Sequence, residues 1–374
     1  MWYNNAYPQN PPFGMDTTIP NPVSLADPWQ GYPGGNPFPT PTPLPQNIIF
    51  PQFGNFVNTP LHAHSMYMQQ WNLSYQKQIG SDWLVSLSYI GNKTTHLWLG
   101  RDINPAVYIP GQSTTSNINN RRRLFLLNPI EGTFYSGIIE TDDEANANYN
   151  GMLTSLQKRF SHGLSWNSNF TVAKCLNDGE ANQNIANVYP DPNDRRSNRG
   201  PCNADRRRIF NNSVLLESPS MGSGALRSIS RNWQLSTIFT MQSGSPLTVT
   251  SGPDNALTGA PGQRPIQIGN PEVANPTINR WFNTAAYIPN PPGVWGEIGR
   301  GTLRGPMNWN LDVAISRRFQ FGENRRIDLR AESFNVLNRF RPNDPNTTLN
   351  NTNFGKITSA QDPRIMQFAA KYVF

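Results

Sequence analysis

The connections between the strand-like segments of this sequence alternate between short and long. Period-two alternation of apolar and polar residues predicts about nine strands, at 65–79, 83–90, 151–160, 163–172, 208–217, 232–242, 308–319, 325–336 and 366–374. The short connections are 80–82, 161–163, 218–231 and 320–324, and the long ones are 91–148, 173–207, 243–307 and 337–362. A soluble sheet has no need to sort its connections by length, whereas outer-membrane barrels have short periplasmic turns and long extracellular loops. The pattern therefore predicts an all-β fold, a transmembrane antiparallel up-and-down β-barrel in the cell outer membrane.

The aromatic residues agree with this topology. Trp83, Phe160, Phe319 and Phe374 lie on the apolar faces beside the short connections, where a barrel wall meets lipid headgroups. Only 36% of the chain is hydrophobic but 11% is aromatic, which suits a wall in outer-membrane lipid with one wet face and long polar loops. We expect a partial barrel, about nine or ten strands of a larger one, because nine strands cannot close a wide barrel.

The last residues, MQFAAKYVF, place Phe368, Tyr372 and Phe374 on one face of a strand. Chain ends usually fray, so an aromatic-rich strand at this position requires an explanation. The pattern resembles the C-terminal signal by which the barrel assembly machinery recognises outer-membrane proteins. We also expect this strand to be paired within a closed wall, so that its edge is not free.

Four stretches carry a wider resemblance: GMLTSLQKRFSHGLSWNSNFTVAK, RNWQLSTIFTMQSGSPLTV, RWFNTAAYIPNPPGVWGEIGRGTLRGPMNWNLDVAISRRFQFGENRRIDLRAESFNVLNRF, and NFGKI with DPRIMQFAAKYVF. Together they look like the C-terminal barrel region of Oar-like TonB-dependent outer-membrane transporters. The resemblance implies a large barrel of about 22 strands, with a signal peptide and a plug that contacts the TonB system. Neither is found here, so we interpret 1–64 as an extracellular loop or linker and 65–374 as the C-terminal part of the barrel of a truncated protein.

Charged residues on the polar faces are candidates for lining the barrel interior. Asp312, Asp328, Arg330 and Glu332 fall on that face of two paired strands, and Arg159 falls on it in another. Such charges can pair across strands and line a channel or contact a plug. They can equally do no more than keep a wet interior satisfied.

Cys175 and Cys202 are candidates for a disulfide. Both fall in one long connection, near the outer ends of two sequential antiparallel strands, which lie about 5 Å apart. The periplasm, through which such a protein passes, is oxidising.

Other polar clusters are interpreted as ordinary loop residues. His62 and His64 could bind a metal weakly, but no third ligand is near them in the sequence. Asp142, Asp143 and Glu144 lack EF-hand spacing, and the arginine runs 121–123 and 206–208 are interpreted as solvated loops. Gly299, Gly301 and Gly305 precede a strand and not a helix, so they do not predict a phosphate site. We expect no cofactor, no metal, no nucleic-acid partner and no enzymatic activity.

Two functions remain open from the sequence. The first is a TonB-dependent receptor and transporter barrel for uptake of an unidentified solute. The alternative is an outer-membrane structural or adhesion protein that binds a partner through its long loops.

Overall fold

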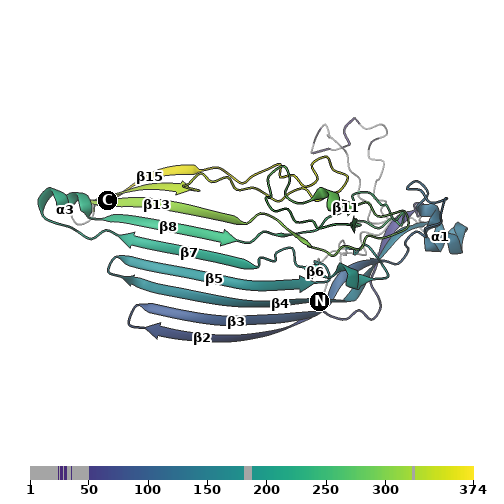
Figure 1. The fold of residues 1–374 in the computed structure, drawn as a ribbon, viewed down its shortest axis with the longest axis horizontal. Coiled ribbons are helices and arrows are strands. Elements are labelled where there is room, and N and C mark those ends of the chain that lie inside the picture. Colours follow the sequence, from purple (N-terminus) through teal and green to yellow (C-terminus); the bar gives the residue numbers. More distant parts are fainter. Residues whose placement is uncertain are drawn as a thin grey trace.

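The computed structural model describes residues 50–180, 188–321 and 325–374, together with a few positions before residue 50. Most of the segment 1–64 and the turn at 322–324 therefore lie outside the described residues. Within the described ranges, an 11-stranded sheet dominates the fold (Figure 1).

The sheet contains every strand that the alternation predicts. These strands are β2 Tyr67–Ile79, β3 Trp83–Asp102, β4 Tyr135–Ser161, β5 Leu164–Asn177, β7 Arg208–Glu217, β8 Trp233–Gln242, β13 Asn308–Phe321, β14 Arg325–Phe334 and β15 Ile365–Val373. Each pairs antiparallel with the next of these strands, in the order β15-β14-β13-β8-β7-β5-β4-β3-β2. The prediction of an antiparallel up-and-down wall is thus confirmed.

Two additional strands join the wall beyond this path. β1 Gly54–Asn58 pairs with β4 in parallel, and β6 Gly200–Pro201 pairs with β5. β1 lies in the segment 1–64 and pairs with the outer part of β4, and the interpretation of that segment as an extracellular loop or linker remains a prediction.

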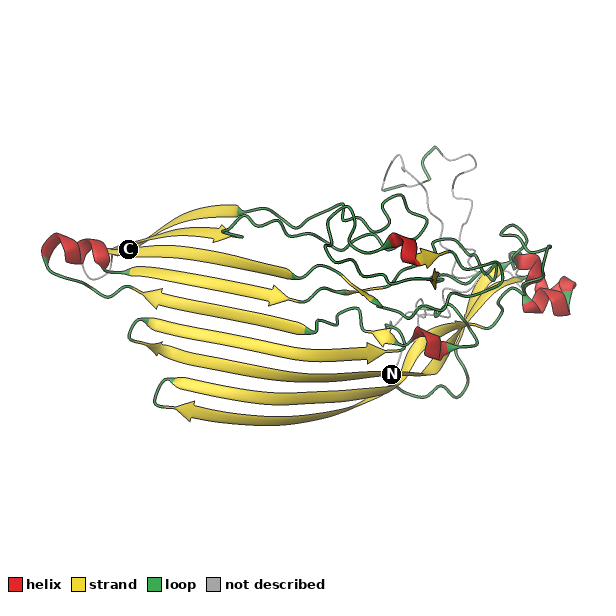
Figure 2. Ribbon diagram, in the orientation of Figure 1, coloured by secondary structure: helices red, strands yellow, loops and turns green. Residues whose placement is uncertain are grey.

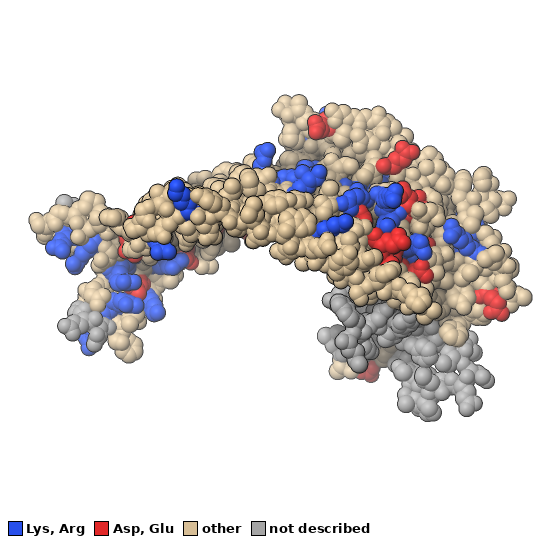
Figure 3. All heavy atoms as spheres, turned by 90° about the horizontal axis from the view of Figure 1, so that it is seen from below, with Lys and Arg blue, Asp and Glu red and all other residues tan. Residues whose placement is uncertain are grey.

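The sheet is open. Among the described strands, β15 pairs only with β14 and β2 only with β3, so these two strands form the edges. The final strand therefore does not close a barrel within the described chain, contrary to our expectation. Figure 3 shows the result, a sheet bent into an arch with a hollow underside, which is consistent with part of a barrel wall.

Cross-strand register keeps the apolar residues on one face. Ile315 of β13 lies opposite Leu235 and Ala331, while the neighbouring Ala314 lies opposite Ser236 and Glu332. Large apolar side chains on the first face remain exposed, such as Leu73 at 75% and Phe368 at 75%. In water such exposure would be costly, so this face is suited to lipid.

Aromatic rings form rows near both ends of the wall. Near the loop end, a chain of ring contacts with centroid distances of 5.8–6.5 Å runs from Phe170 through Phe210 and Phe239 to Trp309. Near the short turns, Trp83 packs edge-on against Trp166, and Arg317 lies between Trp233 and Phe319. The row beside the short turns was predicted, and the row at the loop end was not.

A small buried cluster of Leu97, Leu99, Ala145 and Tyr189 lies at the outer ends of β3 and β4, and a larger hydrophobic core lies outside the wall, among the loops. Leu247, Val249, Phe282, Tyr287 and Leu303 are buried together in the connection 243–307, and Leu349 and Phe354 from the next long connection pack against them. Short strand pairs stabilise this region: β9 Pro246–Leu247 with β12 Leu303–Arg304, and β10 Ile266–Gln267 with β11 Tyr287–Ile288. We call the long connections between β3 and β15 the cap. The cap lies at one end of the sheet in Figure 2 and the short turns lie at the other.

The helices are short and stand at the two ends of the wall (Figure 2). The α-helices are α1 Arg123–Leu127 and α2 Pro129–Gly132 in the cap, and α3 Gly224–Ser230 at the turn between β7 and β8. The described part of the cap also contains 3-10 turns at Asn119–Arg121, Arg195–Asn198 and Thr284–Ala286. Among the helices of the described residues, none has the length and apolar character needed to cross a membrane.

Candidate functional site

Three of the predicted lumen charges are neighbours on β14. Asp328 accepts a hydrogen bond from Arg318 of β13 at 3.2 Å and lies 3.3 Å from the Arg326 guanidinium. Arg330 donates to Glu332 at 2.6 Å. All three face away from the apolar side, as their register partners show. Each of the two carboxylates is thus paired with at least one arginine, as expected for charged groups on a polar face. A role of these residues in lining a lumen remains a prediction.

Asp312 and Arg159 lie apart from that group. Asp312 accepts hydrogen bonds from the Asn310 side chain at 2.7 Å and from the backbone N–H of Asn335 at 2.8 Å. Asn335 has a positive φ of 50°, so Asp312 helps to hold the sharp end of β14. Arg159 is exposed on β4 near the short turn, separated from β13 by three strands.

The aromatic residues of the expected assembly signal lie together on the exposed apolar side of β15. Phe368 is opposite Ala331, and Tyr372 is opposite Ile327. The ring of Phe374 stacks on Tyr372 with 6.0 Å between centroids. Recognition of these residues by the assembly machinery remains a prediction.

Cys175 and Cys202 are joined by a disulfide, with their Cα atoms 5.4 Å apart. Cys175 belongs to β5 and not to the loop, because β5 extends to Asn177 and pairs there with β6. The backbone carbonyl of Cys175 also accepts from the backbone N–H of Cys202 at 3.2 Å. The bridge therefore fastens a cap segment to the outer end of the wall.

Two wall strands extend well beyond their predicted limits and carry the main polar site. β3 continues to Asp102 and β4 begins at Tyr135, so the loop between them is much shorter than 91–148. The acidic residues Asp142, Asp143 and Glu144 are part of β4. Our interpretation of these residues as a solvated acidic loop is therefore wrong.

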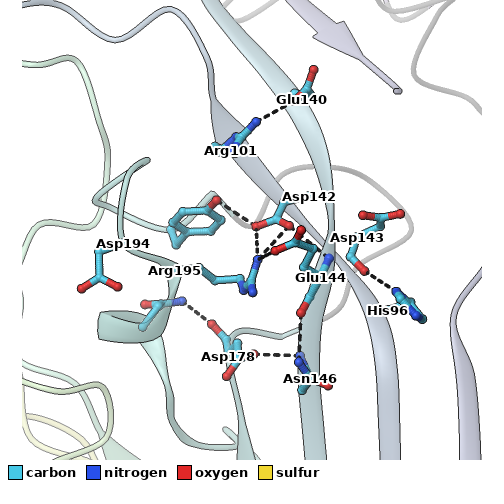
Figure 4. Close-up of polar contacts among 12 residues, drawn as sticks. His96, Arg101, Glu140, Asp142, Asp143, Glu144, Asn146, Asp178, Asp194 and Arg195 are labelled. Carbon is cyan, nitrogen blue, oxygen red and sulfur yellow. Dashed lines mark hydrogen bonds and ion pairs between the residues drawn. The ribbon is translucent and has the colours of Figure 1, made fainter. Parts of the chain in front are cut away.

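These acidic residues line a cavity of about 560 Å³, together with Tyr189, Arg195 and Arg101 (Figure 4). Nη1 of Arg195 lies 3.0 Å from both carboxylate oxygens of Asp142 and 3.2 Å from Glu144. The Tyr189 hydroxyl donates to Asp142 at 2.8 Å. The Asp142 side chain is only 7% exposed. The hydrogen bonds from Arg195 and Tyr189 therefore offset the cost of burying this carboxylate.

The environment of this cavity shifts the pKa values of Arg195 and Tyr189. Burial lowers the pKa of Arg195, but the hydrogen bond and charge of Asp142, with help from Glu144, outweigh burial and raise it. Burial and the bond to Asp142 raise the pKa of Tyr189. Both groups therefore stay protonated across the physiological range and can act as hydrogen-bond donors.

A second cavity, of about 270 Å³, lies against the first and shares Asp194 with it. Arg264 and Trp295 line it. Arg264 is 3% exposed and donates to the Ser197 carbonyl at 3.2 Å. Burial and the charge of Arg300 lower the pKa of Arg264, while Asp194 raises it. Within the described residues, the Nε atom of Arg264 and the indole nitrogen of Trp295 are buried and have no hydrogen-bond partner.

Buried arginines hold the cap loops around these cavities. Arg121 donates to the carbonyls of Val107 at 2.5 Å and Leu257 at 2.9 Å, and Arg122 pairs with Asp102 at 3.3 Å. Both arginines are about 95% buried, with exposures of 4% and 5%. The interpretation of 121–123 as a solvated run is therefore wrong for these two residues. In the other run, Arg207 pairs with Asp205 and remains half-exposed.

The histidines also differ from our expectation. His64 does have potential ligands near it, because His96 and Asp143 approach it from β3 and β4. Gly301 and Gly305, by contrast, lie at close backbone approaches in the cap, against Pro201 and Asp344 respectively. This packing agrees with a loop role and not with a phosphate site.

A scan of protein families matches residues 1–367 to the outer membrane beta barrel domain. The chain belongs to that family. Its place is the cell outer membrane, as the alternation of turns and loops predicted. Because such barrels have short periplasmic turns and long extracellular loops, the cap and both cavities of this barrel face the outside of the cell.

Several solved structures show a partial likeness to this chain. They include the outer membrane transporter YddB of Escherichia coli, with a TM-score of 0.49, 10% identity, and coverage of 86% of this chain and 34% of that one. FpvA of P. aeruginosa gives a TM-score of 0.39, 11% identity and coverage of 82% and 27%. The FrpB iron transporter of Neisseria meningitidis gives a TM-score of 0.39 and 9% identity, and the match covers 86% of this chain and 33% of that one. The barrel chain thus spans between 27% and 34% of the length of these proteins. No curated protein matches it.

Proposed function

We propose that this barrel is the C-terminal part of an Oar-like TonB-dependent transporter, which takes up a solute through the outer membrane. The observation that carries the proposal is the sequence resemblance of 208–374 together with its arrangement. The resembling segments form the consecutive neighbours β7, β8, β13, β14 and β15 of one antiparallel wall. In such transporters a plug within the barrel contacts the TonB system, and this coupling is part of the proposal.

The cap supplies a surface on which a solute would first be held. The larger of its two adjoining cavities is lined mainly by charged and polar groups, including Arg195 and Tyr189, and the smaller one is lined by both polar and apolar groups, among them Arg264 and Trp295. Their donors are fixed by buried hydrogen bonds, so little ordering would be needed on binding. The lining favours a hydrophilic solute over a hydrophobic one.

The test compares the spent medium of three strains: wild type, a strain lacking the gene for this chain, and a strain lacking TonB. We expect at least one solute to remain in the medium of both deletion strains and to be consumed again when the gene is restored. If the gene deletion changes no solute, or changes one that the TonB-deficient strain still consumes, the proposal is wrong.

The alternative, an adhesion or structural role, draws on a different feature. The cap has its own hydrophobic core, which would present a fixed outer surface to a partner. Loss of cell attachment in the gene deletion, with unchanged solute uptake, would favour this alternative.

A further inference from the structure

Two histidines and an aspartate meet at the outer ends of β2, β3 and β4. His64 lies just before β2, His96 lies in β3, and Asp143 lies in β4. Each offers one ligand atom, and these atoms lie within 4.8 Å of one another. The rings of His64 and His96 stack with 4.7 Å between centroids. Figure 4 shows the contact between His96 and Asp143.

An irregularity in β3 positions His96. The register between β3 and β4 shifts on both sides of Leu97, and His96 has a positive φ of 56°. That backbone conformation is uncommon for a residue with a side chain. Bulges re-aim side chains at functional places in sheets, and here the ring is directed to the neighbouring strand.

The hydrogen bonds of His96 leave one ring nitrogen available. Its Nδ1 lies 3.1 Å from the backbone carbonyl oxygen of Asp143. A carbonyl can only accept, so Nδ1 carries the proton and Nε2 presents its lone pair. Histidines that bind metals are typically held in this way, with the other ring nitrogen donating to a carbonyl or carboxylate.

His64 and Asp143 form the other half of the cluster. Nδ1 of His64 lies 2.9 Å from Oδ2 of Asp143, and the backbone N–H of His64 donates to the same carboxylate oxygen. A metal ion that replaced the shared proton would need the two atoms to separate by about half an ångström, to the spacing of adjacent ligands at about 2.1 Å from the ion.

We propose that His64, His96 and Asp143 form a binding site for a divalent transition-metal ion of the zinc class. Two imidazoles and one carboxylate are ligands that such ions accept, with a fourth position left for water. The Asp143 side chain is 14% exposed and that of His64 is 66% exposed, so the site is partly enclosed but open to ions from the medium. The ion would fasten the segment before β2, which the indole of Trp98 already holds by a 2.8 Å bond to the His64 carbonyl.

The site is independent of the proposed transport function. Asp143 also borders the larger cap cavity, together with Arg101 of β3 and Pro60 of the segment before β2, but neither His64 nor His96 lines that cavity. The proposal can therefore be tested without a known solute.

The test measures zinc binding by isothermal titration to the full chain, purified in detergent and stripped with a chelator. We expect one ion per chain. H64A, H96A and D143N should each weaken binding at least about tenfold. His62, two residues from His64, supplies the matched control, and H62A should bind zinc like the wild type.

A second measurement follows the segment itself. Zinc should slow chymotrypsin cleavage near Leu61 and Tyr67, both exposed, in the wild type and H62A but not in H64A. H64A changes an exposed side chain and should leave the fold intact, so its result stands even where H96A folds poorly. Absence of binding by the wild type, or unchanged binding by both H64A and D143N, would overturn the proposal.

Discussion

An arginine placed at Val313 should destabilise the barrel by about 2–4 kcal/mol, the cost of a charge at the bilayer midplane of such a wall. Position 313 lies midway between Trp309 and Arg317. Trp309 belongs to the aromatic row at the loop end, and Arg317 contacts Trp233 in the row beside the short turns. The eight steps between them span about 27 Å along a strand, or about 20 Å of membrane thickness at a tilt of about 40°. Val313 is therefore near the middle of the apolar band.

The matched control is an arginine at Ala314. This residue lies at the same depth but on the opposite face, directly across from Glu332, with which a new arginine could pair. We expect a cost below about 1 kcal/mol, because only the lipid face must exclude charge.

The assay is a denaturant titration of each variant folded into lipid vesicles, with free energies of unfolding compared at equal lipid composition. Equal penalties at 313 and 314, or a larger penalty at 314, would refute the assignment of the two faces.

Four further predictions concern the end of the chain and the cap. Deleting Phe374 removes an exposed aromatic ring from the end of β15, and we expect a clear drop in surface levels, measured by whole-cell antibody binding; wild-type levels would count against the assembly signal. Thiol labelling of the denatured, unreduced protein from outer membranes should find no reactive cysteine, and removing the bridge with C175S and C202S should cost about 3–4 kcal/mol for a loop of this length. Arg195→Met leaves the buried Asp142 carboxylate without its ion-pair partner and should lower the stability of the cap by about 3–5 kcal/mol. Hydrogen exchange measures this loss, and R195M/D142N should recover part of it. Burial raises the pKa of Asp205, but the Cys175 backbone N–H and the charges of Arg304 and Arg207 outweigh burial and lower it. Its contribution to stability is therefore complete above its usual pKa of 3.8 and is lost as the pH falls below that value, so proteolysis of the cap should accelerate in acid in the wild type more than in D205N.

The wall could be predicted from sequence because lipid imposes a strict pattern on it. Each strand between the aromatic rows must alternate, and one apolar face is obligatory. The outer parts of β3 and β4 escaped detection because they extend beyond the lipid. There neither face must be apolar, and the stretch TDDEA, residues 141–145, carries no alternation of apolar and polar residues although it lies within β4.

The polar sites could not be predicted from the sequence for a different reason. Arg121 and Asp142 are typical surface residues by composition, and their burial depends on partners more than 50 positions away, such as Leu257 and Arg195. His96 is 32 positions from His64, and the bulge that turns it leaves no signature in the sequence. Only the cysteine pair could be placed from strand order alone, because its two ends are fixed to neighbouring strands.

The separation of the wall from the cap core means that this protein is stable in two different solvents at once. The wall keeps its apolar side exposed and depends on lipid or detergent to cover it, whereas the residues around Val249 and Phe282 are shielded from water by the cap itself. A change of detergent should thus alter the stability of the wall and leave that of the cap almost unchanged. A denaturant that acts in water should unfold the cap and leave the wall almost unchanged. The cap can accordingly accumulate changes in its outer surface without any cost to insertion in the membrane.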